Sequence, residues 1–133
     1  MVQHKQTQLL VLWVIWASLF TSIIIYQLVL GHGVPSGENA PNAGVHFAVV
    51  LAIGQIAVAS LVRWRFIPRA MNPKQLLVLV IIGLALSEAV EFYGLFLVAA
   101  DQPGTKLSLW VLSLLCALQF IPIYAKAEDR SSN

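Results

Sequence analysis

Four long apolar runs, separated by short polar segments, organise this sequence. They cover residues 9–30, 45–64, 73–100 and 106–124. A hydrocarbon core about 30 Å thick needs roughly 20 apolar residues in a helix, and every backbone polar group must be satisfied within it. Short connections between such runs favour antiparallel neighbours. The pattern therefore predicts an all-α membrane protein, with four transmembrane helices in one domain (residues 1–133) that pack as an antiparallel bundle.

The polar segments contain the signals expected at helix ends. A polar leader, residues 1–8, precedes the first run, and a loop rich in Gly, Pro and Asn follows it at residues 31–44. Asn72 and Pro73, with Gln75 three positions after the Asn, are typical of a capped helix start. Residues 101–106 predict a tight turn, and residues 125–133 form a polar tail.

Composition supports the same class. The chain has 133 residues, of which 59% are hydrophobic and 11% charged, and its mean hydropathy is +0.80. Too few polar residues remain to coat a soluble globule. The single Cys116 excludes an intrachain disulfide.

The orientation follows from the basic residues. Lys106 alone lies on one side of the predicted bundle, and the other side has Lys5, Arg63, Arg65, Arg69, Lys74, Lys126 and Arg130. The positive-inside rule therefore predicts that both termini and the 63–74 linker are cytoplasmic. Four of these residues could also bind lipid headgroups, namely Arg63, Arg65, Arg69 and Lys74, although the orientation rule already accounts for them. We expect a bacterial inner membrane or an equivalent energy-transducing membrane.

Two acids interrupt the third run. At the helical rise, Glu88 lies about 21 Å from Lys74 and about 20 Å from Asp101, near the middle of a bilayer. An ionised acid there costs on the order of 3 kcal/mol by insertion scales. Protonation, burial against other helices or binding of a cation would lower this cost, and like-charge proximity favours keeping at least one acid protonated.

The neighbours of the acids predict protein contacts. Glu88 and Glu91 are three positions apart and share one side of a helix. Small residues beside them would let another helix approach closely, and the helix-packing candidates are Gly54, Gly83 and Gly94. The supporting candidates are Gln55, Ser87 and Tyr93, with Gln55 a possible hydrogen-bond partner of Glu88. No Lys, Arg or His lies near the middle of any run, so the acids are largely protonated or receive positive charge from a partner or a bound ion.

Part of this helix resembles a known family. The run Glu88-Ala-Val-Glu-Phe-Tyr-Gly-Leu95, preceded by Gly83-Leu-Ala-Leu86, is similar to the acid-bearing helix of the rotary ATP synthase proteolipid, the c subunit. The resemblance implies that Glu88 is the carboxylate that binds a proton or sodium, with Tyr93 and Gly94 in the following Tyr-Gly pair. It covers residues 83–95 only. The second run has only Gly54 where proteolipids have a glycine series, and the linker is longer and more basic.

Other chemistry has less support. His32, Glu38 and His46 in or beside the 31–44 loop have the atoms to bind a metal, but their spacing matches no standard site, so we predict solvated loop residues and no metal. No nucleophile with an adjacent base and no phosphate-binding Gly loop is evident, so we predict that the protein is not an enzyme. The few basic residues lie at membrane edges, which argues against nucleic acid as a partner.

Two functions remain. In the first, a mid-membrane carboxylate pair binds a proton or sodium ion, with no other cofactor, as part of a homo-oligomer or an ion-translocating complex. In the second, the chain is a non-catalytic accessory or assembly subunit of a larger membrane complex, and its acids pair with a partner. The resemblance of residues 83–95 to an ion carrier favours the first.

Overall fold

The computed structural model describes residues 2–41 and 46–123. It also leaves out the side chains of Val2, His4, Lys5 and His46. The predicted polar tail, with Lys126 and Arg130, lies outside the described residues.

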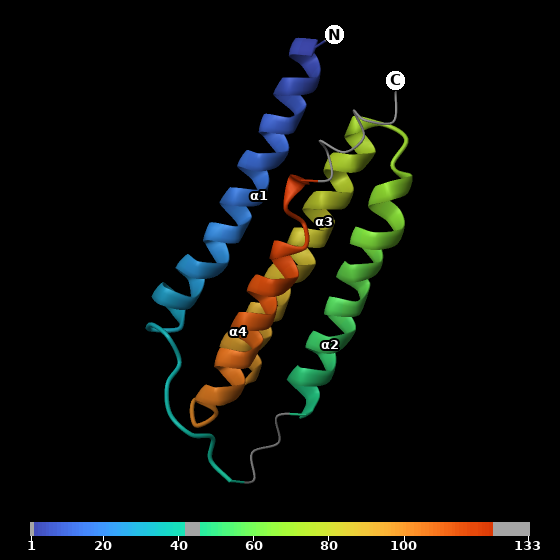
Figure 1. The fold of residues 1–133 in the computed structure, drawn as a ribbon. Helices are drawn as coiled ribbons and strands as arrows, with labels where there is room; N and C mark the ends of the chain where they lie inside the picture. The colour runs from blue at the N-terminus through green and yellow to red at the C-terminus, as the bar shows by residue number, and fades with distance from the viewer. Residues whose placement is uncertain (1, 42–45, 124–133) are drawn as a thin grey trace.

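The described residues form four helices that run alternately up and down, so that consecutive helices are antiparallel (Figure 1). These are α1 (Val2–Leu30), α2 (His46–Leu61), α3 (Pro73–Phe92) and α4 (Pro103–Leu118). A π-helical segment, η1 (Val62–Phe66), and a 3₁₀ turn, η2 (Ile67–Arg69), continue α2, and a π-helical segment, η3 (Tyr93–Leu97), continues α3. The described part of the chain contains no strand, which confirms the predicted all-α class.

Helix α3 is central and contacts each of the other three helices. The N-terminal helix α1 and the green helix α2 lie on opposite sides of the α3–α4 pair (Figure 1). The α2–α3 connection and the start of α1 lie at one end of the bundle, and the α3–α4 turn lies at the other (Figure 1). The basic linker is thus separated from Lys106 by the length of the bundle.

Three helical stretches are long and apolar enough to cross a membrane. They are Gln6–Leu30 and Pro73–Leu97, each of 25 residues, and Phe47–Arg69, of 23 residues. The shorter apolar helix Pro103–Leu118 has 16 residues, which is about 24 Å of α-helix.

Several helix ends differ from the prediction. Helix α1 begins at Val2 instead of residue 9, because the polar residues of the leader are compatible with helix even though they are not apolar. Helix α4 begins at Pro103, inside the predicted turn, since proline suits the first helical turn. It ends at Leu118, before the predicted residue 124, because Pro122 has no N–H to bond the Leu118 carbonyl. That carbonyl accepts a bond from the N–H of Ile121 instead.

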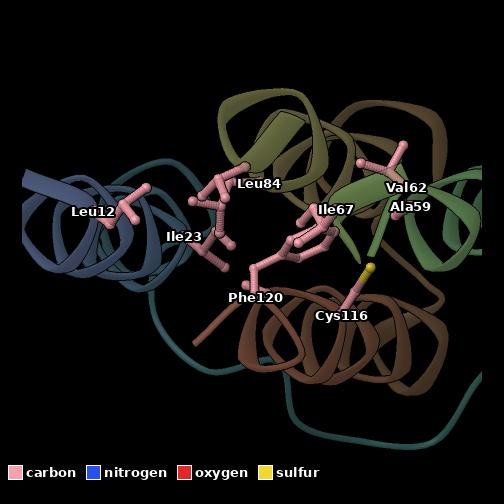
Figure 2. Packing of buried hydrophobic residues seen from close by; sticks show 10 residues of the cluster. Leu12, Ile23, Ala59, Val62, Ile67, Leu84, Cys116 and Phe120 are labelled. Carbon is pink, nitrogen blue, oxygen red and sulfur yellow. The ribbon is translucent and has the colours of Figure 1, made fainter. Parts of the chain in front are cut away.

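The end of α4 packs into the main hydrophobic core. Phe120 is fully buried, and its ring lies among Ile23 of α1, Leu84 of α3 and Ile67 of the linker (Figure 2). Ala59, Val62 and Cys116 complete the side of this core nearer α2 (Figure 2). The core therefore joins all four helices near the end of the bundle that has the basic linker.

The loop after α1 is tied to the start of α4. Asn39 Oδ1 accepts hydrogen bonds from the backbone N–H groups of Gly104 and Thr105, at 2.8 and 3.3 Å. The adjacent Gln102, at the N-cap position, makes no side-chain cap of its own. Asn39 thus caps α4 from a distant part of the sequence and satisfies N–H groups that a helix start leaves free.

Candidate functional site

Helix α3 starts as the sequence predicted. The Asn72 side chain accepts a hydrogen bond from the Gln75 N–H at 2.8 Å, and the Gln75 side chain accepts one from the Met71 N–H at 3.0 Å. These bonds fix the first turn of the helix that positions both acids. Beyond the acids, the backbone N–H of Tyr93 donates to the carbonyl oxygens of Ala89 and Val90. The π-helical segment η3 begins at this residue.

Glu88 faces helix α1 and is half-buried. Its Oε1 lies 2.8 Å from Ser22 Oγ, and the same hydroxyl lies 2.7 Å from the Leu19 carbonyl oxygen. A hydroxyl has one hydrogen, and a backbone carbonyl can only accept. Ser22 Oγ can therefore donate to the Leu19 carbonyl or to Glu88 Oε1, and it can also accept a hydrogen bond from a protonated Glu88. Ser22 thus offers Glu88 a hydrogen-bond partner in either protonation state.

Glu91 is buried more deeply. Its side chain is 1% exposed, and neither carboxyl oxygen has a hydrogen-bond partner among the described residues. The main chain of Gln27 in α1 comes near this carboxyl without bonding to it. A charged carboxylate in such surroundings would be strongly unfavourable.

The three glycines predicted to allow helix packing differ in their surroundings. A Cβ built on Gly83 would collide with the Phe120 ring, and one built on Gly94 would lie 3.2 Å from Leu109 Cβ. Both glycines therefore allow α4 to approach α3 closely. Gly54 has no helix close to it within the described part of the chain, because a Cβ there would meet nothing within 4 Å. Helix α2 buries a row of alanines instead, at positions 48, 52 and 59.

Among the described residues, none of the three supporting residues forms a hydrogen bond with either acid. Ser87 donates to the Gly83 carbonyl of its own helix at 2.9 Å. Tyr93 donates to Gln55 Oε1 at 3.3 Å, which joins α2 to the end of α3. The structure thus gives Gln55 a different partner from the predicted Glu88. Tyr93 and Glu88 thus take part in two separate interhelical contacts, the first with α2 and the second with α1.

One buried polar residue near the site was missed by sequence reasoning. Gln27 is 2% exposed, and its Nε2 donates to the Gly33 carbonyl at 2.9 Å. Gln27 lies five positions after Ser22, on the side of α1 that also buries Ile23. The sequence signal for this residue was a glutamine within an apolar run.

The four basic residues predicted to bind lipid headgroups differ in their surroundings. Arg63 Nε donates to the Gln119 carbonyl at 2.5 Å, at the end of α4, and its guanidinium lies 4.8 Å from the centroid of the Trp64 ring. Arg63 is half-buried and already bonded to α4, whereas the prediction treated it as equivalent to the other three. Arg65, Arg69 and Lys74 are exposed.

The candidate metal residues do not come together in the described part of the chain. No group of three or more His, Cys, Asp or Glu side chains that could hold a metal ion occurs there. His32 and Glu38 are exposed, and the side chain of His46 lies outside the described residues.

Comparison of the chain with protein-family models, with curated proteins and with solved structures gave no match. The resemblance to the proteolipid helix therefore rests on residues 83–95 alone and stays a prediction.

Proposed function

We propose that this chain is a small integral membrane protein whose two α3 acids bind a proton in the middle of the bilayer, as part of an oligomer or an ion-translocating complex. The observation that carries the proposal is the pair of contacts at Ser22 Oγ. This hydroxyl can donate to a carboxylate or accept from a protonated carboxyl, which supports reversible binding of a proton at Glu88.

The bundle suits a lipid solvent. Three of its helices have the length and composition of membrane spans. Many of their large apolar side chains are exposed, including Val14, Ile25, Val50, Ile53, Val58 and Ile82. In water such a surface would aggregate, and in a bilayer it is the expected outer face.

The polar contacts favour a proton over sodium. A hard metal cation requires several oxygen ligands at short range. In the described residues, Glu88 has one side-chain partner, Ser22, and the oxygens of Glu91 have none. A proton needs one carboxyl and one acceptor, which Glu88 and Ser22 supply.

The two acids take different parts in this proposal. Glu88 is half-buried and can exchange its proton with a group outside the chain. Glu91 is almost fully enclosed and stays neutral, so that it sets the polarity near Glu88 without adding a second charge.

The exposure of Glu88 also favours a second candidate, an accessory subunit whose acid pairs with a partner's basic residue. Such a partner can reach Glu88 from outside the bundle. It cannot reach Glu91 without separating the helices, because the Glu91 side chain is buried within the chain itself. The accessory role therefore depends on Glu88 alone.

Infrared difference spectroscopy of the protein in liposomes across a pH series tests the proposal. A protonated carboxyl has a carbonyl band that the carboxylate lacks. We expect one such band to disappear reversibly as the pH rises, and Glu88→Gln to abolish that change. The variant Glu38→Gln is the matched control, because Glu38 is an exposed loop acid.

Repeating the series with and without sodium separates the two ions. A titration that sodium does not displace supports proton binding. If sodium shifts it to lower pH, the site binds a metal cation as well. If Glu88→Gln leaves every titrating band unchanged but releases the chain from a larger complex, the accessory role is correct and the proton site is not.

A further inference from the structure

A shallow groove lies on the outer face of α2, where this helix meets the basic linker. Its volume is about 580 Å³, and it is lined by Ala57, Ser60, Leu61, Trp64 and Arg65. These positions recur at helical spacing and so share one side of α2 and η1. The lining includes the small side chains of Ala57 and Ser60 and the larger ones of Leu61 and Trp64.

The groove is mostly apolar along its length, and one end of it is cationic. From Ala57 to Arg65 the helix rises about 12 Å, enough for part of an acyl chain to lie along it. The Trp64 side chain is 68% exposed, as expected of an aromatic residue at a membrane interface. Arg65 stands at the end of the groove nearest the linker and is exposed.

Charge around the groove favours an anionic occupant. The sequence has no Asp or Glu between Glu38 and Glu88, so no acid of the linker competes for Arg65. Arg69 and Lys74 add positive potential nearby, while Arg63 is already bonded to the Gln119 carbonyl. An arginine fork suits a phosphate group, with which it can form two parallel hydrogen bonds.

We propose that one anionic phospholipid docks in this groove, with its phosphate on Arg65 and an acyl chain along Leu61 and Ala57. The proposal rests on the membrane insertion included in the proposed function. It does not depend on the proton site, since the groove and the acids lie on different helices.

Native mass spectrometry of the detergent-purified full chain, titrated with phosphatidylglycerol or phosphatidylcholine, tests the docking. We expect the wild type to retain one phosphatidylglycerol in preference to phosphatidylcholine. Loss of one basic contact should weaken this retention about fivefold in Arg65→Gln. The control Arg69→Gln removes the same charge outside the groove and should change retention less than twofold. Ala57→Leu fills the groove without changing charge, and it should also weaken retention.

Three outcomes would overturn the proposal. Equal retention of the two lipids in the wild type would show that no anionic site exists. Equal losses in Arg65→Gln and Arg69→Gln would indicate diffuse attraction by the linker. If Ala57→Leu leaves lipid retention intact and changes the ratio of monomer to dimer, a second copy of the chain occupies the groove.

Parallel measurements separate this proposal from the proposed function. The infrared titration of Glu88 in the same Arg65→Gln protein should remain as in the wild type. Release of the chain from cell membranes by alkaline carbonate would refute membrane insertion, and with it both proposals. Retained insertion and a normal titration without lipid preference would refute the lipid site alone.

Discussion

Glu88 and Glu91 lie three positions apart on α3, yet their surroundings differ. Glu88 faces the outer helix α1, remains half-buried and contacts Ser22. Glu91 is almost fully buried, the main chain of Gln27 in α1 comes near it, and its carboxyl oxygens have no hydrogen-bond partner among the described residues. Three residues along a helix correspond to a rotation of about 60°, which is enough to move a side chain from a helix interface to the bundle interior.

The comparison predicts that two acids three positions apart on one helix have opposite effects on stability. A carboxyl that makes an interhelical hydrogen bond contributes to association of the helices. A buried carboxyl without a partner incurs the loss of its hydration without compensation. Substitutions on the two sides of α3 therefore test whether this distinction is real.

The largest effect is expected at Gly83, on the buried side. Gly83→Ala places a methyl group against the fully buried Phe120 ring and should lower the free energy of unfolding by up to about 3 kcal/mol. Denaturation in mixed detergent micelles, followed by circular dichroism, measures this change. Gly54→Ala is the control, and it should be neutral or stabilising by less than about 1 kcal/mol. Similar losses in both variants would mean that α4 does not close this side of α3.

Replacing each acid by leucine should change stability in opposite directions. Glu91→Leu keeps a similar side-chain size and removes an unsatisfied buried group, so it should raise the free energy of unfolding by about 2 kcal/mol. Glu88→Leu removes the contact with Ser22 and should lower it by about 0.6 kcal/mol. The same micelle denaturation measures both variants. A clear loss of stability in Glu91→Leu would indicate that Glu91 has a partner, such as a bound ion.

The smallest effect is expected at Ser22. Ser22→Ala removes the bond between α1 and α3 and should lower the free energy of unfolding by about 0.6 kcal/mol. It should also shift the carbonyl band of protonated Glu88, because the carboxyl loses its acceptor. Ser108→Ala is the matched control, since Ser108 bonds only the Gly104 carbonyl of its own helix. An unchanged Glu88 band in Ser22→Ala would contradict the proposed hydrogen bond.

Local signals in the sequence were sufficient for the helices themselves. Long apolar runs predicted four membrane spans, because each helix satisfies its own backbone. Three helical stretches of the described residues have the length and composition of a span, whereas Pro103–Leu118 is shorter. Asn72 and Gln75 predicted the start of α3, because a cap involves only neighbouring residues. Spacing also put both acids on one helix, and the small residues at positions 83 and 94 predicted close packing beside them.

Only the tertiary structure decided which contact each polar residue makes. It paired Glu88 with Ser22, gave Gln55 to Tyr93 and enclosed Glu91, because these outcomes depend on the rotation and depth of neighbouring helices. It also turned Gly54 outward, bonded Arg63 to α4 and capped α4 with Asn39. In apolar runs whose residues are hydrophobic on nearly every side, periodicity carries little information about which face is inward, so helix rotation is fixed only when the helices pack.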